Sequence, residues 1–359
     1  MVRRVISIVS AVALGVGTLV AGAGAAGADE VIVVRPGESI QAAINRATPG
    51  TTVIVRKGVY RENLEITTDR LTLIGSGAKL RFPTRPLPNV CGDPDIVELT
   101  SGICIHGEIT LGSQGPIVGR PVRGVKVTGF TVQGFGGTGI YVIGGADTEI
   151  DHNRLLNNTE YGIFANSSTS TVIAENRTTS STEAGIYVGD SPQSRAKVVG
   201  NETDHNNAGV FIRNAQRGSL DDNLIHDNCI GTFVLADAPG PAGGFRMTGN
   251  TITRNRKYCP ANAAEQSPAL SGIGVALVGG QNMNIQKNWI VDNGPSGPVD
   301  FTGGVVLVTG GPTAPHGNTV RRNVIVTNEL DIFSDGTGSG NLLDLNFCQT
   351  SQPPGLCVA

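Results

Sequence analysis

Short runs of alternating aliphatic and polar residues fill most of the chain, and one phrase returns between residues 148 and 328. The typical copy has an Asn, an aliphatic residue two positions later, and then the order Gly-aliphatic-aromatic-aliphatic, with Thr in some of the aliphatic positions. The clearest copies are Asn153…Gly162-Ile163-Phe164-Ala165, Asn176…Gly185-Ile186-Tyr187-Val188, Asn201…Gly209-Val210-Phe211-Ile212 and Asn223…Gly231-Thr232-Phe233-Val234. Repetition of this kind predicts a solenoid in which each repeat is one coil.

The positions of the Asn give the length of a coil. It recurs at Asn153, Asn176, Asn201, Asn223, Asn250, Asn288, Asn323 and Asn346, in steps of 23, 25, 22, 27, 38, 35 and 23 residues. A coil of 22 to 25 residues accommodates three short strands and three bends. The longer steps predict loop insertions near residues 258–270 and 295–300.

Stacking the coils assigns an inside and an outside. We expect interior rows two positions after the Asn and three before it: Leu155, Ile225, Ile252, Ile290, Ile325, and Ile150, Ile173, Val198, Leu220, Met247, Ile285, Val320. Side chains alternate along a strand, so the aromatic residue of the phrase points outward. The predicted exterior ladder consists of Tyr141, Phe164, Tyr187, Phe211 and Phe233.

The region before the repeats predicts strands at residues 31–34, 52–56 and 64–67 and a short amphipathic helix at residues 39–47. An N-terminal strand and helix can cover the edge that a stack of strands otherwise leaves unpaired. Residues 81–120 contain five prolines and two cysteines, so we expect one disulfide-stapled insertion there.

Three phrases in this region carry a resemblance: Ser39-Ile40-Gln41-Ala42-Ala43-Ile44, Gly58-Val59-Tyr60-Arg61-Glu62 and Leu71-Thr72-Leu73-Ile74-Gly75. They resemble the opening coils of right-handed parallel β-helix proteins of the pectin-lyase-like superfamily, including pectin methylesterases. The resemblance extends from about residue 31 to the end and implies an all-β, single right-handed parallel β-helix. The catalytic Gln- and Asp-centred phrases of pectin methylesterases have no counterpart here. Asp93-Pro94-Asp95 resembles the acidic motif of alginate epimerases, without its His.

Composition narrows the possible functions. The chain has 359 residues with 50 Gly, 16% charged residues and a net charge of −3, so it lacks the basic surface that nucleic-acid binding requires. We expect no nucleic-acid partner and a monomer. Residues 1–28 combine Arg3 and Arg4, an apolar run and a small-residue end, the layout of a secretory signal peptide. A retained membrane anchor is the alternative. Cleavage predicts an extracellular or cell-envelope protein without stable membrane insertion, whose single domain is residues 29–359.

Six cysteines in an exported chain predict disulfides. Fifteen pairings are possible, and proximity favours Cys91–Cys104, Cys229–Cys259 and Cys348–Cys357. A metal site on these cysteines is the weaker interpretation, because the chain has no Cys-x-x-Cys.

The first candidate site lies beside the aromatic ladder. Exposed aromatic rows are surfaces on which sugar rings stack, although a loop covering the ladder would make it a second small core. Asp190, Arg213 and Asp237 follow the strands of three successive coils. We expect them close together as catalytic residues, with Arg213 as a base or carboxylate clamp and the two Asp as acid and base or as ligands of a cation such as Ca²⁺. An Asp turn cap and a surface ion pair are the plain alternative.

A secondary candidate site follows the Asn by three and four residues. Asp204 and His205 in one coil and His226 and Asp227 in the next would stack with their order reversed. Such a column could hold a metal or move protons, whereas polar residues at a bend are more often solvated.

These features predict a secreted protein that binds and cleaves or modifies a uronate-containing polysaccharide, as a lyase, hydrolase or epimerase. A non-catalytic β-helix that binds glycans or surfaces, or a metal-binding accessory protein, is the competing hypothesis.

Overall fold

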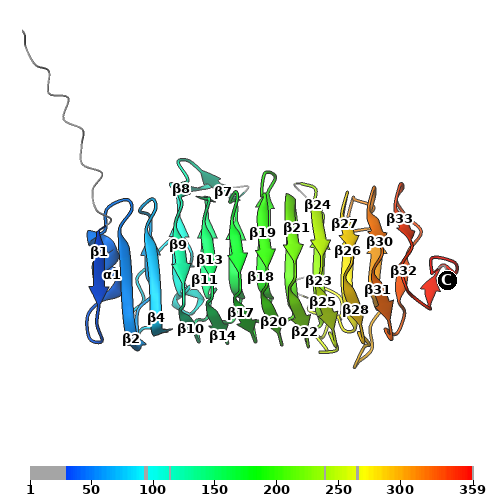
Figure 1. Cartoon of the computed structure of the whole chain (residues 1–359), viewed down its shortest axis with the longest axis horizontal. Helices are drawn as coiled ribbons and strands as arrows, with labels where there is room; N and C mark the ends of the chain where they lie inside the picture. The colour runs from blue at the N-terminus through cyan, green and yellow to red at the C-terminus, as the bar shows by residue number, and fades with distance from the viewer. Residues whose placement is uncertain (1–29, 93–95, 113–114, 238–239, 264–266, 358–359) are drawn as a thin grey trace, which may run out of the picture.

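A computed structural model describes residues 30–92, 96–112, 115–237, 240–263 and 267–357. Within these residues the chain forms a long stack of parallel coils, with its two ends at opposite ends of the stack (Figure 1). The all-β parallel β-helix expected from the repeat is therefore confirmed. The expected signal peptide at residues 1–28 and the Asp93-Pro94-Asp95 motif lie outside the described residues.

Each regular coil contributes one strand to each of three parallel sheets. The first sheet contains β1 Val31–Val34, β2 Thr52–Tyr60, β4 Thr72–Arg81, β9 Lys126–Thr128, β13 Glu149–Asp151, β16 Val172–Ala174, β19 Ala196–Val199, β24 Gly243–Thr248, β27 Asn284–Gln286, β30 Thr319–Arg321 and β33 Leu342–Asp344. The second contains β10 Thr131–Gln133, β14 Arg154–Leu156, β17 Arg177–Thr179, β20 Glu202–Asp204, β22 Leu224–His226, β25 Thr251–Thr253, β28 Trp289–Val291 and β31 Val324–Val326.

The third sheet carries the aromatic residues. It contains β3 Leu64–Ile66, β5 Ile103–His106, β11 Ile140–Ile143, β15 Tyr161–Asn166, β18 Ala184–Ser191, β23 Ile230–Leu235, β26 Ile273–Val278, β29 Gly303–Val308, β32 Ile332–Ser334 and β34 Ser351–Gln352. One long strand, β21 Ala208–Asp221, pairs in the third sheet at its start and in the first sheet at its end. The register matches residues at equivalent repeat positions, as in Phe164 opposite Tyr187 and Tyr187 opposite Phe211.

The interior is one continuous apolar core that runs the length of the stack. Both predicted interior rows are confirmed, since every member is at most 1% exposed. The repeated Gly of the phrase has a steric reason: a Cβ on Gly162 would lie 2.5 Å from the carbonyl oxygen of Gly185, and one on Gly231 would lie 2.5 Å from that of Gly274. Any side chain there would separate adjacent coils.

The recurring Asn forms a buried ladder along one bend. Asn201 illustrates it: its Oδ1 accepts hydrogen bonds from the backbone N–H and the Nδ2 of Asn176, at 2.9 and 3.1 Å. Its own Nδ2 donates to Ile173 O at 2.8 Å and to Asn223 Oδ1 at 3.0 Å. Asn201 Nδ2 also donates to Val199 O of its own coil at 3.2 Å, but the polar groups of the bend find most of their partners in the coils above and below.

A second, parallel ladder lies five residues further along each coil. Its members are Asn158, Asn206, Asn228, Asn255, Asn293 and Asn328, and Ser181 interrupts it. The sequence contains the signal of this second ladder as a repeated Asn-x-x-x-x-Asn spacing.

The N-terminal phrases cap the first coil. Helix α1 Ile40–Arg46 covers the end of the stack (Figure 1), and the Glu62 carboxylate accepts from the backbone N–H groups of Ile40 and Gln41 at 3.0 and 3.1 Å. The Gln41 side chain pairs with the backbone of Glu65 at the free edge of β3. The predicted helix therefore satisfies the exposed strand edge through specific contacts.

The expected single insertion at residues 81–120 is wrong in extent. Strand β5, within that range, is a regular rung of the third sheet between β3 and β11. Its Gly102-Ile103-Cys104-Ile105 follows the Gly-aliphatic phrase, with Cys in the aromatic position, and Ile103 and Ile105 are fully buried. Two loops flank this rung. One contains the 3-10 turn η1 Val97–Leu99, and the other contains the antiparallel pair β6 Ile109–Gly112 and β7 Gly115–Val118.

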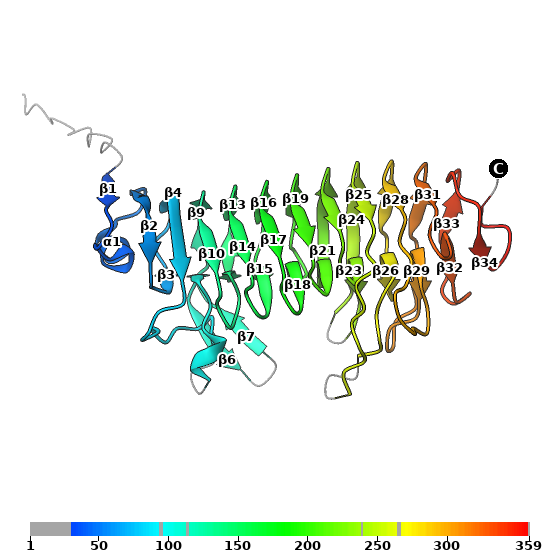
Figure 2. The same cartoon turned by 90° about the horizontal axis from the view of Figure 1, so that it is seen from below.

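Three disulfides join the pairs that proximity favoured. Cys91–Cys104 fixes the first loop to the third sheet, Cys229–Cys259 fixes the loop after β25, and Cys348–Cys357 closes the C-terminal tail. Strands β8 Val122–Arg123 and β12 Gly145–Ala146 form a small parallel pair beside the first loops. In Figure 2 the β6–β7 hairpin and the loop after β25 project on the same side as β15 and β18. Among the described residues, no helix is long and apolar enough to span a bilayer.

Replacing Asn201 by Ala should test the dependence of the stack on its ladder. The change leaves two donors of Asn176 without their acceptor inside the protein, so we expect a loss of roughly 2–4 kcal/mol in the free energy of unfolding. Asn284→Ala, an exposed Asn on β27, is the matched control and should change stability by less than about 0.5 kcal/mol. Denaturant unfolding measures both, and equal effects would contradict a special role of the ladder.

Candidate functional site

The outward face of the third sheet carries a continuous aromatic ladder. Successive ring centroids are 4.7 Å apart for Tyr141–Phe164, 4.2 Å for Phe164–Tyr187, 5.3 Å for Tyr187–Phe211 and 4.7 Å for Phe211–Phe233. Parallel strands place equivalent residues roughly 4.8 Å apart, which explains this spacing. The register of the parallel strands therefore stacks the five rings in one row, on the outward face predicted for them.

The ladder is not an open platform along its whole length. Tyr141 packs in a small cluster around the Cys91–Cys104 disulfide. Tyr187 is only 2% exposed, because the rings of Phe164, Phe211 and Tyr161 surround it. The Tyr187 ring therefore offers little free face to a sugar and mainly supports its neighbours.

A cleft of about 900 Å³ lies over the C-terminal half of this ladder. Tyr161, Phe211 and Phe233 contribute to its floor and Tyr187 lines it as well, whereas Tyr141 and Phe164 do not. A second outward row explains the depth of the cleft. It consists of Tyr161, Ala184, Ala208 and Ile230. The two alanines carry only methyl groups, and they lie between the larger side chains of Tyr161 and Ile230. Ala208 lines the cleft directly.

The loop after β25 forms one wall of the cleft. Lys257, Tyr258, Cys259 and the residues around Pro268 line it, and the disulfide between Cys259 and the buried Cys229 attaches this wall to the coil beneath. The next loop packs behind it, since a Cβ on Gly297 would lie 2.4 Å from the Tyr258 ring. The insertions predicted near residues 258–270 and 295–300 therefore pack against each other on this side of the cleft.

Arg213 and Asp237 meet at the end of the cleft where the pairing of β21 with β23 stops, Arg213 at the last pair and Asp237 two residues after β23. Arg213 Nη2 donates to Asp237 Oδ2 at 2.7 Å, and its Nε donates to both carboxylate oxygens at 3.1 Å. Asn214, 3% exposed, donates from Nδ2 to Asp237 Oδ1 at 2.7 Å and accepts from the Asp237 backbone N–H at 3.1 Å. The pair is rigid, and its side chains remain 37% and 31% exposed.

This pairing bears on the expected catalytic roles. The hydrogen bonds and charge of Asp237 raise the pKa of Arg213 above its ordinary value, so the guanidinium stays protonated and is unsuited to act as a base. The Asp237 carboxylate is occupied by donors from two residues, which disfavours proton transfer through it. Of the two roles expected for Arg213, base or carboxylate clamp, these contacts favour the clamp, and the pair is suited to binding and orientation.

Asp190 lies in the preceding coil and is held by Tyr187. The Tyr187 hydroxyl donates to Asp190 Oδ2 at 3.2 Å. Asp190 contributes to the negative surroundings of Arg213 without an ion-pair contact to it among the described residues. Gly189 makes this arrangement possible, because a Cβ there would lie 2.0 Å from the Tyr187 hydroxyl. Desolvation raises the pKa of Tyr187, so its hydroxyl remains a donor.

The opposite end of the cleft, at the start of the strands, is lined by Glu183, Asn207 and Lys257. Glu160 precedes Glu183 by one coil, since the Glu183 backbone N–H donates to Glu160 O at 2.9 Å. Burial raises the pKa of the Glu160 carboxyl and lowers the pKa of the Lys257 ammonium. The cleft thus has two polar ends separated by an aromatic and apolar middle.

Sequence analysis missed Tyr161, Glu183 and Lys257. Tyr161 and Glu183 stand one and two positions before the repeated Gly, so aligning that column would have found them. Lys257 belongs to a loop that has no equivalent in the other coils, so the repeat could not place it. Only the folded position of the loop brings Lys257 to the cleft.

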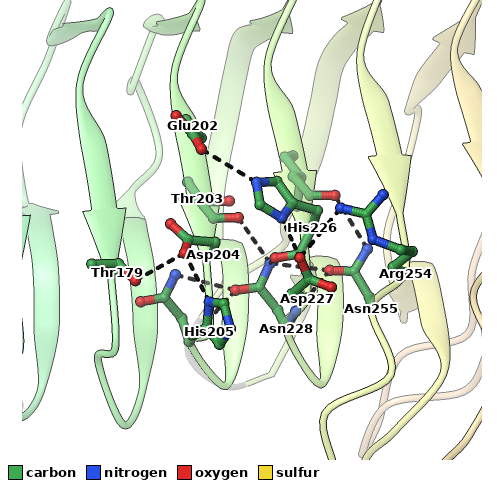
Figure 3. Close-up of polar contacts among 12 residues, drawn as sticks. Thr179, Glu202, Thr203, Asp204, His205, His226, Asp227, Asn228, Arg254 and Asn255 are labelled. Carbon is green, nitrogen blue, oxygen red and sulfur yellow. Dashed lines mark hydrogen bonds and ion pairs between the residues drawn. The ribbon is translucent and has the colours of Figure 1, made fainter.

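The secondary candidate column is placed as the spacing predicted, with Asp204 directly opposite His226. Each His nevertheless bonds to the Asp of its own coil: His205 Nδ1 lies 2.8 Å from Asp204 Oδ2, and His226 Nδ1 lies 2.5 Å from Asp227 Oδ2 (Figure 3). Glu202 is a further charged partner of His226, and Arg254 of Asp227.

The backbone explains why polar residues recur in that column. His205 and Asp227 have φ of 59° and 56° and immediately precede Asn206 and Asn228 of the second ladder. They occupy the left-handed position of the bend. In the described part of the chain, no three His, Cys, Asp or Glu residues form a group able to hold a metal ion, which favours the solvated bend over a metal site in this column.

Comparisons with known proteins agree with this architecture. Residues 138–347 match the family model described as the right handed beta helix region. ORF18 of Geobacillus virus E2 is 10% identical with a TM-score of 0.59, over 88% of this chain and 60% of that one, so the chain spans about 60% of the length of the viral protein. The A-module of mannuronan C-5 epimerase AlgE4 from Azotobacter vinelandii is 16% identical with a TM-score of 0.52, over 87% and 91%. These likenesses show the fold alone. No curated protein matches the sequence.

Gly189→Ala should displace the Tyr187 ring and destabilise the protein by roughly 1–3 kcal/mol, because the new methyl group overlaps that ring. Gly240→Ala is the control, since a Cβ there meets nothing within 4 Å. Denaturant unfolding and the tyrosine signal in near-ultraviolet circular dichroism report the two effects. Combining the change with Tyr187→Ala should cost less than the sum of the single changes, and strict additivity would contradict the overlap.

Proposed function

This chain belongs to the family of right-handed β-helix proteins, and we propose that it binds a uronate-containing polysaccharide in the cleft of the third sheet and cleaves or modifies it. The observation that carries the proposal is the cleft itself. It joins an aromatic floor of Tyr161, Phe211 and Phe233 to charged groups at both ends. Aromatic faces bind the apolar faces of sugar rings, and polar groups at the rim fix hydroxyl and carboxylate groups.

In this proposal Arg213 and Asp237 bind and orient the chain. Arg213 has five N–H donors and uses Nε and Nη2 on Asp237 and a further contact with Tyr187, so the donors beyond these are available to sugar oxygens. Asp237 is held by Asn214 and keeps the guanidinium in place. Asp190 and the Tyr187 hydroxyl extend the same polar edge.

Glu183 is the cleft carboxyl to which we assign proton transfer in the proposed reaction. It lines the wall opposite the Arg213–Asp237 pair, with the carboxyl of Glu160 one coil away. Elimination, epimerisation and hydrolysis of a sugar chain each require a carboxyl or comparable group to move a proton. The expected catalytic triad of Asp190, Arg213 and Asp237 thus becomes a binding edge in this proposal.

A non-catalytic glycan-binding protein is the second candidate, and a specific observation favours it. Arg213 and Asp237, the ion pair of the cleft, are joined by three hydrogen bonds that use Nε and Nη2 and both carboxylate oxygens. A site built only for binding needs such fixed polarity and no mobile proton. Measurements of binding and of turnover distinguish the two candidates.

We also propose export of the protein, with residues 1–28 as the signal peptide and residues 29–359 as one domain acting as a monomer. Three disulfides are consistent with a compartment outside the cytoplasm.

Phe211→Ala should weaken binding of the recognised polysaccharide about 10-fold, because it removes an aromatic face from the cleft floor. The control is Phe347→Ala, which removes a 68% exposed ring near the C-terminal end. Affinity electrophoresis against pectic, alginate-type and glycosaminoglycan polymers measures the change. Unaltered binding by both Phe211→Ala and Arg213→Ala would contradict the assignment of the cleft.

The same polymers test for a reaction. Unsaturated-uronate absorbance reports elimination, new reducing ends report hydrolysis, and a changed uronate composition reports epimerisation, each with and without a chelator. Binding without any product supports the glycan-binding candidate, and a product that Glu183→Gln abolishes supports the enzyme.

A further inference from the structure

The loop after β25 contributes one basic residue to the cleft, Lys257. Its Nζ donates to His205 O at 3.1 Å and to Asn207 Oδ1 at 3.1 Å. Both acceptors are uncharged, and among the residues that the structure describes no carboxylate forms an ion pair with this ammonium. An ammonium has three N–H donors, so one remains for a further acceptor.

The setting of Lys257 differs from that of Arg213 at the other end. The Arg213 charge is compensated by Asp237 at 2.7 Å. Lys257 is partly buried in the cleft wall, and desolvation lowers the pKa of its ammonium. A partly buried cation without an ion-pair partner among the described residues gains more from an incoming anion than a cation that is already paired.

The wall holds Lys257 in a fixed place. Two residues further on, Cys259 is joined to Cys229, which follows Asn207 by one coil in the same column. Lys257 and its acceptor Asn207 are thus connected both by a hydrogen bond and through the neighbouring disulfide. The ammonium is a preorganised donor at the cleft wall.

We propose that Lys257, with Asn207, forms a carboxylate-binding subsite that makes the cleft select uronate sugars over neutral sugars. The inference rests on the proposed function of the cleft and assigns its charge selectivity to this lysine instead of Arg213. Glu183 lies at the same end and restricts the anion to the Lys257 side of the wall.

Isothermal titration calorimetry of the mature protein tests the subsite. The ligands are oligogalacturonate and oligomannuronate of four sugars and the same oligosaccharides after carboxyl reduction, which are neutral. Lys257→Met keeps the length of the side chain and removes the charge. It should weaken binding of the acidic oligosaccharides about 10- to 100-fold and leave the neutral ones within about twofold. Lys257→Arg should restore most of the acidic binding. Lys197→Met, at an exposed lysine of β19, is the control and should bind as the wild type does.

The binding results distinguish the Lys257 subsite from the proposed function of the cleft. Unchanged binding of the acidic ligands by Lys257→Met overturns the subsite and leaves the proposed function standing. Equal weakening for acidic and neutral ligands also overturns it, because the lysine then only supports the wall. Wild-type protein that binds neither ligand class overturns the proposed function and the subsite together.

Discussion

The structure depends on hydrogen bonds that pass from coil to coil through buried Asn side chains. A bend turns backbone N–H and C=O groups away from the strand ladders, and in a stack these groups lie out of contact with water. An Asn side chain supplies both a donor and an acceptor, so each coil satisfies the bend of the one before it. Asn153, Asn176 and Asn201 are linked in this way by successive bonds of 3.0 and 2.9 Å. A shift of one residue would break these bonds and also turn the core row outward.

This fixed register creates the cleft by making exterior side chains accumulate in columns. Where a column carries rings of similar size, as from Tyr141 to Phe233, neighbouring rings cover one another, and Tyr187 becomes buried although it lies outside the solenoid. Where a column changes size, as from Tyr161 to Ala208, a hollow results. The cleft therefore arises from an irregularity in the side chains on a regular backbone, and an inserted loop held by a disulfide encloses it.

Residues that belong to the repeat could be predicted from the sequence, and residues outside it could not. The alignment placed Leu155 and Ile225 inside, brought Arg213 near Asp237, and put Asp204 opposite His226. It failed at β5, because prolines on both sides concealed a rung whose aromatic position is Cys104. It could not foresee that each His would bond to its own neighbour, since register specifies backbone positions and side-chain rotation decides the partner.

The same division explains which charges the sequence could assign to a function. The sequence indicated Arg213 as a functional residue because acidic residues lie near it in adjacent coils. The same proximity means that an acidic residue, Asp237, already compensates the charge of Arg213. Lys257 has no column neighbours to compensate it, because it lies on an insertion that approaches the sheet from outside. Repeat positions build the scaffold and neutralise their own charges across coils. Selectivity for a charged ligand is therefore expected from residues that lie outside the repeat. The repeat pattern does not predict the positions of these residues, and only the three-dimensional structure of the cleft wall shows them.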